Sequence, residues 1–228
     1  TVVATDISER ALRLARFNAE LNGINGIEFR HGSLFEPVEG EQFDLIVTNP
    51  PFVITPRRED VPSYEYRDGG LIGDGIVEAV VSGAADHLTP GGVLQMLGNW
   101  EYRDGATGMD RVASWAGRSE HWIIERELQD PAEYAETWIR DGGTRSGTER
   151  FDELYSAWLD DFEHRGVRQI GLGYILLRRP EATTRTALAR QERLHTALTN
   201  APAGLGAHLQ DALAGWDTQA ALGDAELR

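Results

Sequence analysis

Phe43-Asp44-Leu45-Ile46-Val47-Thr48-Asn49-Pro50-Pro51-Phe52 is the stretch that decides the fold. Its first six residues are mostly apolar and are typical of a buried strand. Pro50 and Pro51 lack the N–H that a strand ladder needs and restrict the residue before them, so we expect the strand to end at Thr48. An asparagine oxygen, a proline carbonyl and an aromatic ring then follow the strand directly.

Strands and helices alternate on both sides of this stretch. That rhythm predicts a mainly parallel sheet covered by helices on both faces. Ser8 is a typical helix cap and Asn22-Gly23 a typical helix stop, so residues 9–21 form the first expected helix. The expected strands are residues 1–5, 27–30, 43–48, 93–97, 122–128 and 170–177, and further helices are expected at residues 72–88 and 109–117.

Two more helices interrupt the closing strands of the sheet. Asp130-Pro131 is a strong helix start, because the aspartate caps and the proline suits the first helical position. From Phe151 onward, apolar residues recur at helical spacing, with acids on the other face. We therefore interpret residues 130–165 as a helical insertion. Composition shifts after Pro180, which predicts one domain over residues 1–180 and a helical extension over residues 181–228, split near residues 200–204.

Bulk composition limits the function classes. The chain has 228 residues, of which 41% are hydrophobic and 26% charged, with no apolar run near the length of a membrane span. It has no cysteine, which excludes thiolate metal sites and fits a reducing cytoplasm. The six histidines show no metal-ligand spacing, so no metal is expected. A net charge of -15 disfavours general coating of nucleic acid.

The chemistry of Asn49 and Pro50 suits a planar NH2 group. Such a nitrogen is a poor nucleophile, because its lone pair is delocalised. The Asn49 side-chain oxygen and the Pro50 carbonyl can each accept one of its hydrogens, which would aim the lone pair at a reaction partner. Phe52 can stack on a flat substrate. Asn-Pro and Pro-Pro also end strands for purely local reasons, so this tetrapeptide alone leaves both interpretations open.

The order of elements and motifs resembles the class I S-adenosylmethionine-dependent methyltransferases. One strand ends at Asp6, the next is followed by Ser33, and a third is followed by Asn49-Pro50-Pro51-Phe52. A helix then leads through Pro90-Gly91-Gly92 into a further strand. More narrowly, it is similar to the branch that modifies amino nitrogens, which includes release-factor glutamine methyltransferases and nucleic-acid amino-methyltransferases. Gly32-Ser33-Leu34-Phe35-Glu36-Pro37, followed by the 43–52 stretch, is especially similar to the glutamine methyltransferases. The resemblance covers residues 1–180 and implies a doubly wound, Rossmann-like sheet with an antiparallel last strand.

The resemblance also implies roles for individual residues. Asp6 would hold the ribose of S-adenosyl-L-methionine, Ile7 would pack on its adenine, and Ser33 and Leu34 would border that ring. Asn49 and Pro50 would be the catalytic pair, with Asn49 also close to the cofactor, and Pro51 and Phe52 would bind substrate. Each of these residues also has a structural interpretation, as a cap, core residue or strand terminator.

Two departures from the family pattern matter. The glycine-rich cofactor loop and the strand before it should precede Thr1 and are not among these residues. An acid usually holds the adenine amino group where Ser33 stands.

Other polar residues carry weaker expectations. Arg57 and Arg58 are candidate substrate-binding residues for a phosphate or an acidic peptide, although such arginines are often only a solvated face. Asn99 and Trp100, expected to follow a strand, could line the substrate side or simply pack. Tyr64 and Tyr66 could belong to a lid.

We therefore expect a cytoplasmic N-methyltransferase that acts on a protein glutamine side chain. A base in structured RNA or DNA is the alternative acceptor. Two other classes stay open. One is a catalytically silent binding module on the same scaffold, and the other is a nicotinamide-dependent dehydrogenase, in which Asp6 would hold the ribose.

Overall fold

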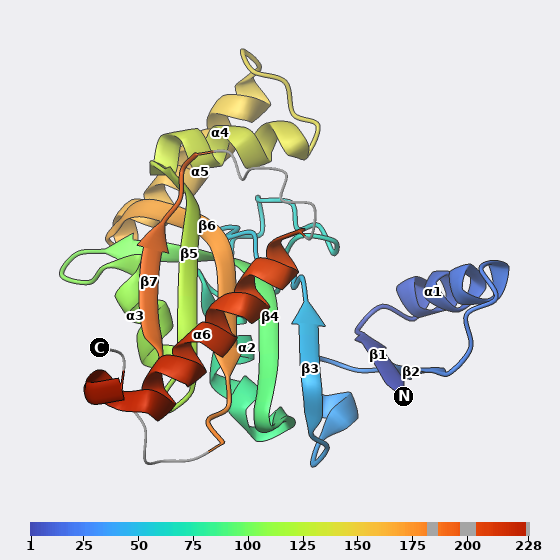
Figure 1. Ribbon diagram of the computed structural model, residues 1–228. Helices are drawn as coiled ribbons and strands as arrows, with labels where there is room; N and C mark the ends of the chain where they lie inside the picture. Colours follow the sequence, from blue (N-terminus) through green and yellow to red (C-terminus); the bar gives the residue numbers. More distant parts are fainter. Residues whose placement is uncertain (182–186, 197–203, 227–228) are drawn as a thin grey trace.

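The computed structural model describes residues 1–181, 187–196 and 204–226. The main sheet has the strand order β3-β4-β6-β5-β7, and a separate two-stranded sheet pairs β1 with β2 (Figure 1). The elements, in chain order, are β1 Val2–Asp6, α1 Glu9–Leu21, β2 Ile27–His31, η1 Glu36–Val38, β3 Phe43–Thr48, α2 Gly75–Gly83, η2 Ala84–His87, β4 Leu88–Arg103, α3 Gly108–Trp115, β5 Glu120–Gln129, α4 Pro131–Asp141, α5 Glu149–His164, β6 Val167–Arg178, β7 Ala189–Arg193 and α6 Gly204–Glu226.

The predicted α/β class is confirmed. β3 pairs with β4 in parallel, and β5 pairs with β7 in parallel. β6 lies between β4 and β5 and is antiparallel to both, as expected for the last strand of the resemblance. Helices cover both faces: α2 and α3 pack on one, while Leu209 of α6 packs on the other against Trp122 and Leu176 (Figure 1).

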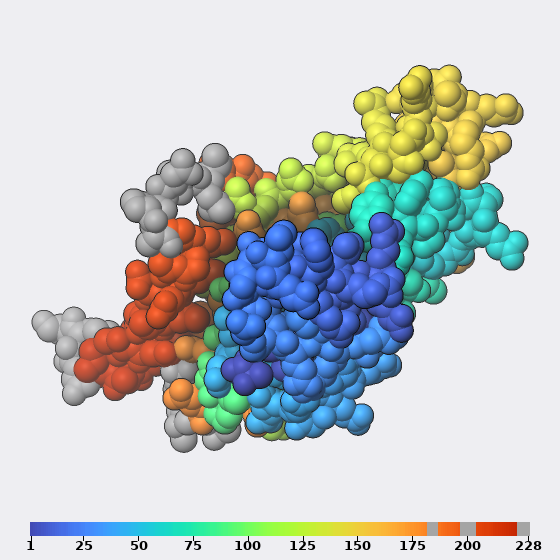
Figure 2. Space-filling view, turned by 90° about the vertical axis from the view of Figure 1, so that its right-hand side faces the viewer, coloured from blue at the N-terminus to red at the C-terminus, as the bar shows by residue number. Residues whose placement is uncertain are grey.

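The sheet is interrupted between β1 and β3. Among the described residues, β1 pairs only with β2 and β3 pairs only with β4. Apolar side chains are exposed along the open edge, with Leu45 59% and Val47 70% exposed in β3. The β1-α1-β2 unit stands in front of this edge in Figure 2. These residues therefore form the sheet in two parts, β1-β2 and β3-β4-β6-β5-β7.

β4 is far longer than the expected strand at 93–97. It begins at Leu88, and Thr89 to Gly92 form a bulge, because Phe43 pairs with Leu88 while Leu45 pairs with Val93. It then continues through Asn99 and Trp100, which are buried inside the strand rather than placed after it. Gly171 and Gly173 of the facing β6 make room for Trp100, since a Cβ on Gly171 would lie 2.2 Å from the Trp100 Nε1.

The segment after Pro180 contains a strand as well as a helix. β7 extends the edge of the main sheet and is held by Arg193, whose Nε donates to the buried Glu125 carboxylate at 3.0 Å. The division into domains at residues 180 and 181 stays a prediction, and the expected split near residues 200–204 lies outside the described residues except for Gly204.

The helical insertion is confirmed as helices α4 and α5, which we call the α4–α5 lobe (residues 130–165). The Asp130 Oδ1 caps α4 by accepting the Glu133 N–H at 2.8 Å. The lobe lies beyond the carboxyl ends of β3, β4 and β5 (Figure 1). No helix among the described residues is long and apolar enough to cross a bilayer.

Candidate active site

A cleft of about 740 Å³ opens between β1 and β3 and extends to the residues that follow these strands. It brings together most residues singled out in the sequence: Asp6, Ile7, Ser33, Leu34, Asn49, Pro50 and Pro51 all line it. They come from three segments that meet because parallel strands end at the same edge.

Asp6 and Ile7 form one wall of the cleft. Asp6 is the last residue of β1, and its Oδ1 accepts the Ser8 backbone N–H at 2.7 Å. Ile7 exposes 63% of its surface. An exposed carboxylate next to an exposed apolar side chain suits a ligand with paired hydroxyls on one part and a flat ring on another.

Ser33 and Leu34 form the floor, after β2. Leu34 has a φ of 47°, and it is the one non-glycine residue with positive φ among those the structure describes. A leucine in this region is strained, and such strain is often retained at ligand sites. The Ser33 backbone N–H donates to a Glu36 carboxylate oxygen at 3.2 Å, which fixes this turn.

Asn49 to Phe52, which we call the motif, lie where β3 ends. Asn49 is exposed, Pro50 is buried and Pro51 is half-buried. The Pro51 carbonyl lies against Gly69, where a Cβ would come within 2.9 Å of that oxygen. Phe52 does not line the cleft: it packs against two hydrophobic clusters and forms an antiparallel bridge with Asp68.

Residues 53–70, which we call the motif loop, close back on the motif. The Val53 N–H donates to the Arg67 carbonyl at 2.9 Å. The Asp68 carboxylate is fully buried and accepts from Arg57, from the Ser63 hydroxyl at 2.9 Å and from the Gly70 N–H at 3.1 Å. This carboxylate therefore sets the shape of the loop.

The two arginines expected to bind substrate lie away from the cleft wall. Arg57 pairs with Asp68 and donates to the Leu71 carbonyl at 3.0 Å. Arg58 pairs with Asp60 at 2.9 Å and points toward Asp160 of α5. Both guanidinium groups thus have carboxylate partners within the protein.

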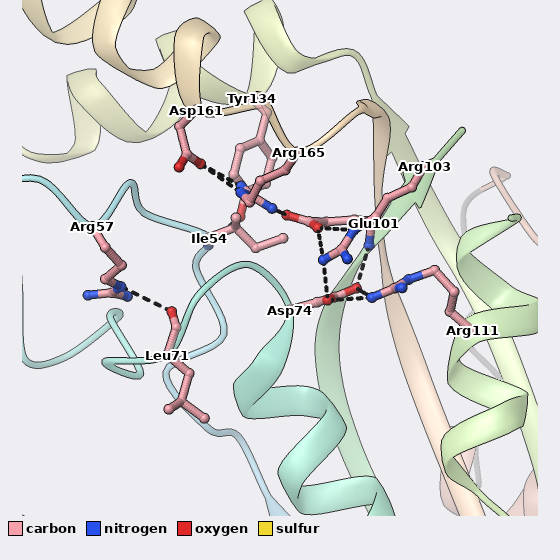
Figure 3. A network of polar contacts seen from close by, with 10 residues as sticks. All are labelled: Ile54, Arg57, Leu71, Asp74, Glu101, Arg103, Arg111, Tyr134, Asp161 and Arg165. Atoms are coloured by element: carbon pink, nitrogen blue, oxygen red, sulfur yellow. Dashed lines mark hydrogen bonds and ion pairs between the residues drawn. The ribbon is translucent and has the colours of Figure 1, made fainter. Parts of the chain in front are cut away.

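The α4–α5 lobe supports the motif loop through a second hydrophobic core. Val53, Ile54 and Val61 of the loop pack with Tyr134 and Trp158 of the lobe. The Tyr134 hydroxyl accepts the Ile54 N–H at 3.1 Å (Figure 3). Figure 2 shows the loop lying directly below the lobe.

A buried ionic network attaches the lobe to the sheet (Figure 3). Glu101 of β4 has no exposed surface and pairs with Arg165 at the end of α5 and with Arg103. Asp74, before α2, accepts from Arg111 at 2.8 Å and from the Glu101 N–H at 3.0 Å. Each buried charge here has a partner, as buried charges require.

Sequence reasoning missed the cleft-lining residues after the motif. These are Glu65, Asp68, Gly69 and Gly70 of the motif loop and Ile76 and Val80 of α2. Their positions depend on contacts across the chain rather than on a local pattern. Among the described residues, no group of three or more histidine or acidic side chains could hold a metal ion.

Comparisons with known proteins show that part of the chain is similar to methyltransferases. Residues 1–112 match the family "Methyltransferase small domain". The chain is 37% identical over 106 residues to a release factor glutamine methyltransferase of Xylella fastidiosa. The aligned stretch covers 44% of this chain and 38% of that protein. It is 36% identical over 102 residues to a ribosomal protein uL3 glutamine methyltransferase of Bradyrhizobium diazoefficiens, covering 41% of this chain and 32% of the relative.

A crystal structure of a methyltransferase from Pyrococcus furiosus overlays with a TM-score of 0.41 at 17% identity, over 79% of this chain and 63% of that one. The chain spans well under half the length of the curated relatives named above. The part that matches the family, residues 1–112, contains β1, β2, β3, the motif and the motif loop. Residues 1–112, which contain every residue lining the cleft, thus match the methyltransferase small domain family.

Proposed function

We propose that this protein transfers a methyl group from S-adenosylmethionine to the side-chain amide nitrogen of a glutamine in another protein. The observation that carries this proposal is the shared cleft: Asn49 and Pro50 line the same space as Asp6, Ile7 and Leu34. Relatives named as glutamine methyltransferases of a release factor and of a ribosomal protein support this acceptor.

The residues of the cleft fit such a cofactor. Asp6 offers a carboxylate to the ribose hydroxyls, and Ile7 and Leu34 offer apolar surface to the adenine. When bound, the cofactor supplies a methyl group on a positively charged sulfur, which is an excellent leaving group. The acids Asp6 and Glu65 line the cleft and have no ion-pair partner among the described residues, which suits a cation.

Asn49 and Pro50 act on the acceptor. The Asn49 side-chain oxygen accepts one amide hydrogen and the Pro50 carbonyl accepts the other. This orients the nitrogen lone pair toward the methyl group, and positioning of this kind lowers the barrier without any acid or base. A new N–C bond forms as the S–C bond breaks, and the extra proton leaves the nitrogen afterwards.

The charge of the cleft favours a polypeptide over RNA or DNA as acceptor. No arginine or lysine is among the residues that line it, while three carboxylates are. A phosphodiester chain would meet unfavourable charge there. Arg57, Arg58 and Arg67, the basic residues of the motif loop, are each paired with an acid.

We also propose that a further strand, outside these 228 residues, lies between β1 and β3. The resemblance implies such a strand and the glycine-rich loop after it. The open edges of β1 and β3, with Leu45 and Val47 exposed, support the idea, because exposed apolar edge strands are normally covered. The strand would join the two sheets and fill the part of the cleft between β1 and β3. The part beyond the carboxyl ends of these strands, lined by Asp6, Leu34 and Asn49, would remain open as the cofactor and acceptor site. We place the reaction in the cytoplasm.

Incubation of the complete protein with methyl-labelled cofactor and a lysate tests the acceptor. Mass mapping of proteolysed protein and of digested RNA would locate the label. We expect methylglutamine in a protein fragment. Label found only in RNA would contradict the proposal, and calorimetry with S-adenosylhomocysteine that gives no heat would favour a silent binding module.

A further inference from the structure

Glu65 is a carboxylate of the cleft that the motif does not account for. It lines the cleft together with Asn49, Pro50 and Pro51, and its side chain is exposed. Within the described ranges it makes no hydrogen bond or ion pair. The other two acids of the cleft differ: Asp68 is neutralised by Arg57, and Asp6 caps the turn at Ser8.

The residues on either side of Glu65 are fixed to the α4–α5 lobe. The Tyr64 hydroxyl donates to the Gly142 carbonyl at 2.9 Å, and the Tyr66 hydroxyl donates to Asp141 at 2.6 Å. Gly142 permits this approach, since a Cβ there would lie 2.8 Å from the Tyr64 hydroxyl. Glu65 is thus held between two anchored tyrosines on the cleft side.

Arg67 makes this anchoring rigid. Its guanidinium is 5% exposed, pairs with Asp141 at 2.6 Å and donates to the Trp138 carbonyl at 2.8 Å. It also lies 4.3 Å from the ring centroid of Tyr64. A planar guanidinium that both stacks and donates holds its partners in one geometry. The loop therefore presents Glu65 at low entropic cost.

We infer that Glu65 selects acceptor polypeptides that carry a positively charged side chain close to the methylated glutamine. This rests on the proposed function. A carboxylate without an internal partner among the described residues, lining the same cleft as Asn49 and Pro50, suits an arginine or lysine of the substrate, which forms charge-assisted hydrogen bonds with it. Because no basic side chain lines the cleft, an incoming cation has no internal competitor there.

Binding of synthetic peptides to the complete protein tests this without turnover. Each peptide contains one glutamine and a single arginine at one of the four nearest positions, and its matched control has citrulline there. Citrulline has nearly the same shape as arginine, but a carbonyl oxygen replaces one of its NH2 groups and the side chain has no charge. Calorimetry in the presence of S-adenosylhomocysteine should give, for at least one position, an affinity roughly tenfold higher with arginine.

The Glu65→Gln variant should reduce this preference to below twofold. The matched control, Glu59→Gln, changes an exposed acid of the same loop that does not line the cleft, and it should keep the preference. Equal affinities for arginine and citrulline peptides in the wild type would overturn the inference. So would a preference that survives Glu65→Gln, or the absence of binding by every peptide.

The outcome also separates this inference from the proposed function. Charge-dependent binding that Glu65→Gln abolishes, in peptides that never become methylated, would support the role of Glu65 and contradict methyl transfer to glutamine. Methylation of glutamine with no preference for the charged peptides would support the proposed function and contradict the role of Glu65.

Discussion

The hydroxyl of Tyr134 in α4 accepts the backbone N–H of Ile54, which lies 80 residues earlier and two residues after the motif. The same hydroxyl donates to the Asn99 Oδ1 of β4 at 2.8 Å. One buried side chain thus joins the lobe, the motif loop and the sheet. Burial raises the pKa of this phenol, which keeps the hydroxyl proton available for the bond to Asn99.

The Tyr134→Phe substitution should therefore destabilise the protein and disturb the acceptor side of the cleft. It leaves the Ile54 N–H and the Asn99 oxygen buried without their partner, at a cost of about 1–3 kcal/mol. Urea unfolding measures the loss. The same change at Tyr155, a half-buried residue whose hydroxyl has no partner in the described part of the chain, is the control and should cost less. Equal losses would contradict the role of the Tyr134 hydroxyl.

Replacement of Arg67 by methionine should slow methyl transfer while leaving the cofactor site intact. Without the guanidinium, Tyr64, Trp138 and Asp141 no longer fix the motif loop, and small displacements of bound groups cost roughly ten- to a hundredfold in rate. Steady-state kinetics should show a lower kcat, and calorimetry an unchanged affinity for S-adenosylhomocysteine.

Arg140→Met is the matched control for Arg67. Arg140 lies on α4, the helix that Arg67 contacts, is exposed and, in the part of the chain that the structure describes, pairs only with Glu136 of that helix. Its loss should leave kcat unchanged, because surface pairs contribute about 0–1 kcal/mol. An equal fall in kcat for both variants would show that the effect of Arg67 is not positional. The Arg67→Lys variant should recover little of the lost kcat, because lysine cannot stack and donate as a planar fork.

His121 gives the protein a pH-dependent stability. Burial lowers the pKa of this half-buried imidazole below its usual value near 6.5. The folded state therefore favours the neutral ring, so its stability contribution is present above about pH 6.5 and is lost as the pH falls below that value. The urea midpoint of the wild type should fall between pH 7.5 and 5.5, and the midpoint of the His121→Gln variant should fall less over the same range. Parallel declines for the two proteins would contradict this assignment.

The strands and helices were predictable where local chemistry alone decides them. The 43–52 stretch, the Asp130 cap and the apolar spacing of α5 each indicated the element that the structure contains. The antiparallel β6 followed from the family resemblance rather than from any local pattern. Most of the proposed cofactor and acceptor residues do meet in one cleft.

The missed features depend on contacts between distant segments. β7 consists of Ala189 to Arg193, which lacks apolar alternation and is recognisable only by its pairing with β5. The sequence placed Asn99 beyond a strand end, yet its side-chain amide donates to the Gly171 carbonyl at 3.0 Å inside the sheet. Glu65 reaches the cleft because Tyr64 and Tyr66 bind a helix more than 70 residues away. No sequence pattern encodes such pairings locally.

The most direct test of the central claim is the turnover of the Asn49→Ala variant on an unmethylated protein substrate that the wild type methylates. Asn49 is exposed in the cleft, so its loss should not affect folding. If its oxygen grips the acceptor nitrogen, kcat should fall roughly a hundredfold or more, as for other groups that act at the transition state, with the affinity for S-adenosylhomocysteine unchanged within about twofold. Turnover equal to that of the wild type would contradict the account.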